Sequence, residues 1–116
     1  MIAISQKFQA SGQLSEAVGA LERAIWLSKE PAHLLVDLGN LRQDQGNQLA
    51  AKLCYERALE SDPVCIAALQ NLGYLLFNLG ETEKSSDIYA QLLAVAPTAL
   101  NRLLAASVLP VVYRTR

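Results

Sequence analysis

Apolar side chains recur every three or four residues along most of the chain, and short polar stretches with Gly or Pro separate the runs. After Gly12, for example, Ala17, Leu21, Ala24 and Ile25 share one side of a helix of about 3.6 residues per turn. The pattern predicts an all-α chain of seven helices. One ends at Gly12, and the others cover about 14–28, 31–45, 48–61, 63–79, 82–95 and 97–109.

Glycine and proline mark several predicted features of these helices. Gly12 is expected to end the first helix in the left-handed conformation that glycine tolerates. Asp62 and Pro63 read as an N-cap followed by a proline at the first helical position. Gly39 and Gly73 lie inside helices, where their small size would let a facing helix approach closely.

The pattern repeats with a displacement of 34 positions. Residues 66–99 repeat the key positions of residues 32–65: Leu72 repeats Leu38, Gly73 repeats Gly39, Gly80 repeats Gly46, Tyr89 repeats Tyr55, and Pro97 repeats Pro63. The same step backwards pairs Gly12 with Gly46, Ala17 with Ala51, and Ala24 with Ala58. A fixed period of this length with two helices per period is typical of stacked helix-turn-helix units.

The middle unit resembles the tetratricopeptide repeat family through Leu38, Gly39, Gly46, Ala51, Tyr55, Ala58 and Pro63. Ser85 and Leu92 depart from this pattern in the third unit, and Lys29 departs from it in the first. The resemblance implies a single domain over residues 1–116, built as a right-handed α-solenoid of three helix-turn-helix repeats. These repeats would cover about 1–31, 32–65 and 66–99, and a C-terminal seventh helix would cover about 97–109.

Charge and composition narrow the classes of partner. The chain has 10 Lys and Arg against 11 Asp and Glu, a net charge of −1, so it lacks the basic excess of a nucleic-acid-binding or anionic-membrane-binding domain. No apolar stretch reaches the roughly 18 residues of a membrane span, and the N-terminus lacks the apolar run of a secretory signal. We therefore expect a cytoplasmic protein with no nucleic-acid or membrane partner.

Residues with possible chemistry have structural interpretations. His33 is the only histidine, and Cys54 and Cys65 show no metal-ligand spacing, so we expect structural thiols. Trp26 is expected to cover the joint between repeats. The sequence shows no nucleophile beside a base, no paired carboxylates and no phosphate-binding glycine loop. Neither catalysis nor a cofactor or metal site is predicted within the chain.

The family resemblance also implies a site, because the first helices of successive tetratricopeptide repeats line a concave groove. The residues of this chain that would project into the groove are Gln6, His33, Asp37, Asn40, Gln43, Gln70, Asn71, Tyr74, Phe77 and Asn78. Side-chain amides can bond both the N–H and the C=O groups of an extended peptide. The prediction is a protein–protein interaction scaffold that binds an extended peptide or partner segment.

Two other functions stay open. Residues 101–116 resemble the joint where tetratricopeptide repeats meet the catalytic region of SPINDLY-type O-GlcNAc transferases, which implies a substrate-recognition fragment of a larger glycosyltransferase. An RNA-binding repeat of the pentatricopeptide kind has a similar period, but it should carry basic groove residues. The predicted groove contains no Lys or Arg, so this hypothesis ranks last.

The predicted C-terminal helix carries Leu103, Leu104, Val108 and Leu109, which together would form an apolar patch. Monomeric proteins rarely leave such a patch open to water. We expect a second copy to cover it in a two-fold dimer, or a following domain to cover it in a longer parent protein.

Overall fold

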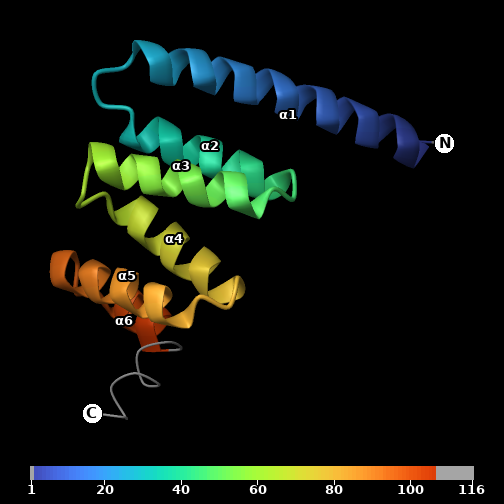
Figure 1. Cartoon of the computed structure of the whole chain (residues 1–116). Helices are drawn as coiled ribbons and strands as arrows, with labels where there is room; N and C mark the ends of the chain where they lie inside the picture. Colours follow the sequence, from blue (N-terminus) through green and yellow to red (C-terminus); the bar gives the residue numbers. More distant parts are fainter. Residues whose placement is uncertain (1, 107–116) are drawn as a thin grey trace.

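The computed structural model describes the backbone of residues 2–106 and the side chains of residues 12–106. The described residues form helices and no strand. The helices are α1 (Ile2–Leu27), α2 (Ala32–Asp44), α3 (Gln48–Ser61), α4 (Ile66–Asn78), α5 (Thr82–Val95) and α6 (Ala99–Ala106). Each helix packs on the next in chain order (Figure 1), and the resulting solenoid confirms the predicted all-α fold class. The predicted seventh helix is α6, and residues 107–109 of that prediction lie outside the described part.

Two complete hairpins, α2–α3 and α4–α5, carry the repeat. Each hairpin turns at a glycine with a positive φ, 79° at Gly46 and 82° at Gly80, a conformation that side chains with a Cβ rarely adopt. After the first turn, the Asn47 side chain accepts a hydrogen bond from the Ala50 N–H at 3.1 Å and caps α3. Local sequence therefore fixes both turns, and the predicted bounds of α3 and α5 agree with the structure.

The helix end predicted at Gly12 is not found. Gly12 lies inside α1, which is continuous from Ile2 to Leu27, and Gly12 is not among the glycines with positive φ. The residue after it is Gln13, a good helix former, whereas Asn47 caps α3 at the corresponding position in the second unit. Glu81, at the same position in the third unit, makes no side-chain cap either, so the missing cap alone does not explain the continuous helix. Within residues 2–106 the two complete helix-turn-helix hairpins are α2–α3 and α4–α5, and Ile2–Leu27 forms one continuous helix before them.

The last turns of α1 nevertheless pack as a second helix of a repeat would. Val18 of α1 joins a small core cluster with Leu38 and Cys54, and Leu21 and Ile25 pack against that cluster. Leu21 and Ile25 therefore face inward as predicted, whereas Val18 is the buried residue of this face and Ala17 and Ala24 are only partly buried.

The start of α4 also differs from the prediction. Asp62 and Pro63 do not begin the helix, since α4 starts at Ile66 with Cys65 as its N-cap. The Asp62 carboxylate accepts a hydrogen bond from the Val64 N–H at 3.2 Å, and the Asp62 carbonyl accepts one from the Cys65 N–H at 3.0 Å. Asp62 therefore builds a turn before the helix rather than capping it.

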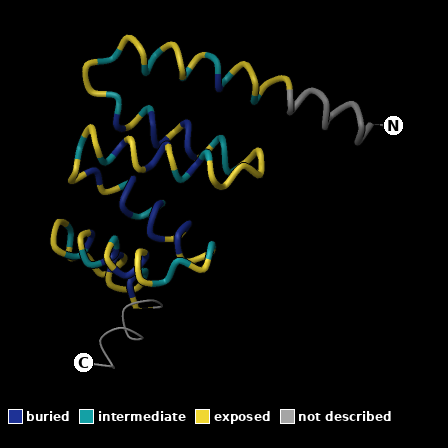
Figure 2. Tube along the Cα trace, in the orientation of Figure 1, coloured by how far each residue is buried: buried dark blue, intermediate teal, exposed yellow. Residues whose placement is uncertain are grey.

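The core lies where the hairpins meet, and Figure 2 shows the buried positions concentrated in α2 to α5. Tyr55 and Tyr89 are among the largest fully buried side chains. A Cβ added at Gly39 would lie 2.5 Å from Cε1 of Tyr55, and one added at Gly73 would lie 3.0 Å from Cζ of Tyr89. The predicted close approach at both glycines is confirmed, and the facing group is a tyrosine ring from the second helix of the same hairpin.

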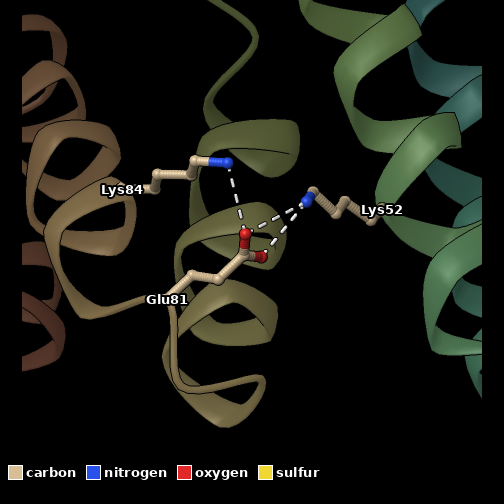
Figure 3. Close-up of polar contacts among 3 residues, drawn as sticks. All are labelled: Lys52, Glu81 and Lys84. Atoms are coloured by element: carbon tan, nitrogen blue, oxygen red, sulfur yellow. Dashed lines mark hydrogen bonds and ion pairs between the residues drawn. The ribbon is translucent and has the colours of Figure 1, made fainter.

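An ion-pair cluster links the two hairpins (Figure 3). Nζ of Lys52 on α3 lies 3.1 Å from Oε2 of Glu81, and Nζ of Lys84 on α5 lies 3.2 Å from Oε1. Hydrogen bonds from Lys52 first, and from Lys84 second, hold the pKa of the Glu81 carboxyl below its ordinary value. Because Glu81 is the N-cap residue of α5, this cluster attaches the turn of one repeat to the second helix of the preceding one.

Candidate functional site

Nine of the ten predicted groove residues can be placed in the structure, and they divide between the first helices of the two hairpins. His33, Asp37, Asn40 and Gln43 lie on α2, whereas Gln70, Asn71, Tyr74, Phe77 and Asn78 lie on α4. All nine are exposed or partly exposed, and α2 and α4 contact each other directly. We call this set the α2/α4 surface. The side chain of the tenth residue, Gln6, lies outside the described residues.

The amides of the α2/α4 surface are already partly hydrogen-bonded within the protein. The Tyr55 hydroxyl donates to Oδ1 of Asn40 at 2.6 Å and accepts from Nε2 of Gln43 at 2.7 Å. Nδ2 of Asn71 also donates to Oδ1 of Asn40, at 3.4 Å, which joins α4 to the same network. Burial raises the pKa of the Tyr55 phenol, and the hydrogen bond with Gln43 opposes that effect. The network therefore holds these amides in place.

Several amide groups of the α2/α4 surface remain available to a ligand. Each Asn or Gln side chain offers two N–H donors and one carbonyl acceptor. No hydrogen bond within the described residues uses Nδ2 of Asn40, Oδ1 of Asn71 or either polar atom of Asn78. The α2/α4 surface thus presents both donors and acceptors, held by a side-chain network that spans α2, α3 and α4.

The α4 half of the surface has a different chemistry at equivalent positions. Tyr74 and Phe77 stand 34 residues after Asn40 and Gln43, and they are 56% and 41% exposed. The Tyr89 hydroxyl consequently makes no hydrogen bond among the described residues, unlike that of Tyr55. Burial, and secondarily the neighbouring Tyr74, raise the pKa of Tyr89. One surface therefore combines an amide network on α2 with an exposed aromatic pair on α4.

Asn101 is a polar position that the sequence reasoning did not single out. It is buried on α6, accepts a hydrogen bond from Nε2 of Gln70 at 2.6 Å, and donates one to the Ala96 carbonyl at 2.8 Å. The available signal was a single amide in a helical stretch whose other residues, apart from Arg102, are apolar. Asn101 fixes α6 beside the α2/α4 surface and engages Gln70, which leaves Gln70 less free than predicted.

Among the other residues singled out in the sequence, the two cysteines agree with the prediction and Trp26 does not. Cys54 and Cys65 are buried free thiols, as expected. Trp26 does not cover the joint between repeats, because 87% of its surface is exposed. No group of three or more His, Cys, Asp or Glu in residues 2–106 is placed to hold a metal ion. Over the same part of the chain, no helix has the combination of length and apolar character that crossing a membrane requires.

The fold and the α2/α4 surface define a helical-repeat protein with an exposed polar and aromatic face. The family model for the tetratricopeptide repeat matches residues 32–65 and 66–98, more than half of the chain. The chain therefore belongs to the tetratricopeptide repeat family. The two matches coincide with the hairpins α2–α3 and α4–α5. A repeat fold of this kind serves as a protein-interaction scaffold and is typically non-catalytic.

Solved structures agree with this assignment. The chain is similar to a tetratricopeptide repeat protein from Parabacteroides merdae, with a TM-score of 0.71 and 31% identity over 89% of this chain and 43% of that one. The MamA RS-1 ArsTM double mutant has the same TM-score at 21% identity, over 89% of this chain and 58% of that one. The chain thus spans about half the length of these structures. No curated protein matches the sequence.

Proposed function

We propose that the α2/α4 surface binds an extended segment of a partner protein. The observation that supports this proposal is the position of the exposed aromatic pair, Tyr74 and Phe77, beside amides that still offer donors and acceptors. An extended peptide needs partners for its own N–H and C=O groups, and side-chain amides supply both. The aromatic pair would take an apolar side chain of the same peptide.

Charge adds a preference to this proposal. Asp37 is an exposed carboxylate on α2, and it has no ion pair within the described residues. The α2/α4 surface holds no Lys or Arg. A Lys or Arg in the part of the peptide that lies over α2 would therefore be favoured, because it would be close to Asp37. The expected ligand therefore combines an apolar anchor over α4 with a positive charge over α2.

Replacing Asn71 and Tyr74 together by alanine tests this assignment. Short random peptides displayed on phage are selected against the full chain, and the affinities of the enriched peptides are measured by fluorescence polarisation. A peptide that occupies the α2/α4 surface should lose about tenfold or more in affinity with the double variant, because an aromatic anchor and an amide partner are both removed.

The double variant is expected to fold normally. Both residues have exposed surface, and the Asn40 carbonyl group keeps its hydrogen bond from Tyr55 when Asn71 is lost. An unchanged circular dichroism spectrum and melting temperature would verify this. If no enriched peptide distinguishes the double variant from the wild type, the assignment of the surface is wrong.

We further propose that α6 mediates self-association. Leu103 is 72% exposed. The equivalent residue one repeat earlier, Leu69, is completely buried against residues of α5 and α6. Leu100 on the same helix is exposed as well. A second copy that places its own α6 on this face would cover both leucines in a two-fold interface.

Light scattering at micromolar concentration should therefore report a dimer for the wild type and a monomer for a Leu100→Glu/Leu103→Glu variant. Both side chains are exposed, so the variant should keep its helical content. A well-folded wild-type monomer would contradict the dimer. That result would be compatible with the alternative hypothesis of a larger SPINDLY-type glycosyltransferase, in which a following domain covers α6.

A further inference from the structure

A hollow between α1 and α3, floored by α2, lies apart from the α2/α4 surface. Its volume is about 450 Å³, and its lining includes Trp26 from α1, Arg42 from α2, and Leu53, Cys54 and Arg57 from α3. None of its lining residues belongs to the α2/α4 surface. We call this hollow the α1/α3 groove.

The repeat itself supplies a reference for the α1/α3 groove. The equivalent hollow one repeat later, beside α3 and α5, has a volume of about 220 Å³. Six of the residues that line the later hollow stand 34 positions after residues that line the α1/α3 groove. Four of these six differ in chemical character: Leu76, Lys84, Asp87 and Ile88 in the later hollow correspond to Arg42, Ala50, Leu53 and Cys54.

The α1/α3 groove is the larger of the two hollows, and two positions on its rim are apolar where the next repeat has acids. Cysteine is smaller than isoleucine, so Cys54 leaves space in the floor that Ile88 fills one repeat later. On the rim, Leu53 replaces an aspartate and is 61% exposed. Trp26 stands where the next repeat has Glu60, and most of its indole faces water. Packing between repeats does not require this apolar rim, because the later joint forms with charged residues there.

The polar groups of the groove are mainly cationic. Arg42 forms an ion pair with Glu22, with 3.1 Å between Nη2 and Oε1. Arg57 makes no ion pair or hydrogen bond among the described residues, and it lies on the exposed face of α3. Burial raises the pKa of the Cys54 thiol, and the charges of Arg42 and Arg57 oppose that rise. The groove therefore has one more positive than negative charge, in a chain whose net charge is −1.

We propose that the α1/α3 groove is a second protein-binding site, and that its ligand is an acidic amphipathic segment of a partner. A large apolar side chain of that segment lies between Trp26 and Leu53, and a flanking carboxylate pairs with Arg57. Tryptophan and arginine are the residue types most enriched among side chains that dominate binding energy at interfaces. An arginine without an internal partner favours a ligand that brings a carboxylate to it.

The test exploits the fact that Trp26 is the only tryptophan of the chain. Peptides enriched from a random phage library against the full chain are synthesised and titrated while tryptophan emission is recorded. Acidic peptides with a large apolar residue should shift the emission to shorter wavelength, because binding removes the indole from water. Peptides that occupy the α2/α4 surface should leave the emission unchanged.

Two variants assign the shift to the groove. Leu53→Asp introduces the residue type found at position 87 of the next repeat, and it should weaken the acidic peptides by about tenfold. Arg57→Glu should also lower the affinity of the acidic peptides. The same variant should bind more tightly those peptides in which the glutamates have been changed to lysine. The Asn71→Ala/Tyr74→Ala variant is the matched control and should not alter their affinity. Melting temperatures measured alongside confirm that each variant is folded.

Three results would overturn the proposal. The first is that no enriched peptide moves the tryptophan emission. The second is that peptides which do move it are insensitive to both Leu53→Asp and Arg57→Glu, or are not acidic. The third is a tryptophan emission that, without any peptide, moves to shorter wavelength as the protein concentration rises, and that does not do so in Leu53→Asp. That result would assign the groove to a second copy of this chain instead.

Discussion

Replacing Tyr55 by alanine is expected to reduce the free energy of unfolding by about 3–5 kcal/mol, the range found when a fully buried aromatic side chain is truncated. The Tyr55 ring is completely buried and lies against Gly39, so its removal leaves a cavity between α2 and α3. Small domains are stable by about 5–15 kcal/mol, so this loss would be a large share of the total. Urea unfolding followed by circular dichroism measures it.

Conservative changes at the two equivalent tyrosines isolate the contribution of the hydroxyl. Tyr55→Phe removes hydrogen bonds with Asn40 and Gln43 and should cost about 1 kcal/mol. Tyr89→Phe should be close to neutral, because the Tyr89 hydroxyl bonds to no described residue. Equal losses at both positions would show that the amide network does not stabilise the fold.

Replacing Gly39 by alanine is expected to lower the free energy of unfolding by up to about 2 kcal/mol, although alanine is the better helix former. The added methyl group would lie 2.5 Å from Cε1 and 2.9 Å from Cδ1 of Tyr55. Overpacking of this kind costs about 1–3 kcal/mol, against a gain of about 1 kcal/mol in helix propensity. The Tyr55 ring cannot withdraw easily, because its hydroxyl is hydrogen-bonded to two amides.

Gly73→Ala is the matched control for this prediction. There the added methyl group would lie 3.0 to 3.2 Å from atoms of the Tyr89 ring, which needs only a small shift to relieve the contact. The helix-propensity gain of about 1 kcal/mol should then offset most of the cost. Thermal and urea unfolding measure the free energy of unfolding of both variants. If Gly39→Ala is as stable as Gly73→Ala, overpacking against the Tyr55 ring does not destabilise the fold.

The sequence by itself determined the features that depend on local chemistry and on its own repetition. The predicted helices leave Gly46 and Gly80 in the gaps between them, and both glycines lie in turns with a positive φ, a conformation that a residue without a Cβ tolerates. The bounds of α3 and α5 followed from the apolar pattern between those turns and the next proline. The family resemblance implied ten groove residues, and the nine whose side chains the structure describes are exposed or partly exposed on α2 and α4.

Only the tertiary structure decided features that depend on competing local signals or on side-chain partners. Gly12 was expected to end a helix as Gly46 does, yet α1 continues through it from Ile2 to Leu27. Asp62 could cap a helix or build a turn, and the turn formed. The hydrogen bonds that occupy Asn40, Gln43 and Gln70 join helices that are distant in sequence. The exposure of Trp26 was likewise decided by packing, because helical periodicity gives the direction of a side chain but not what lies opposite it.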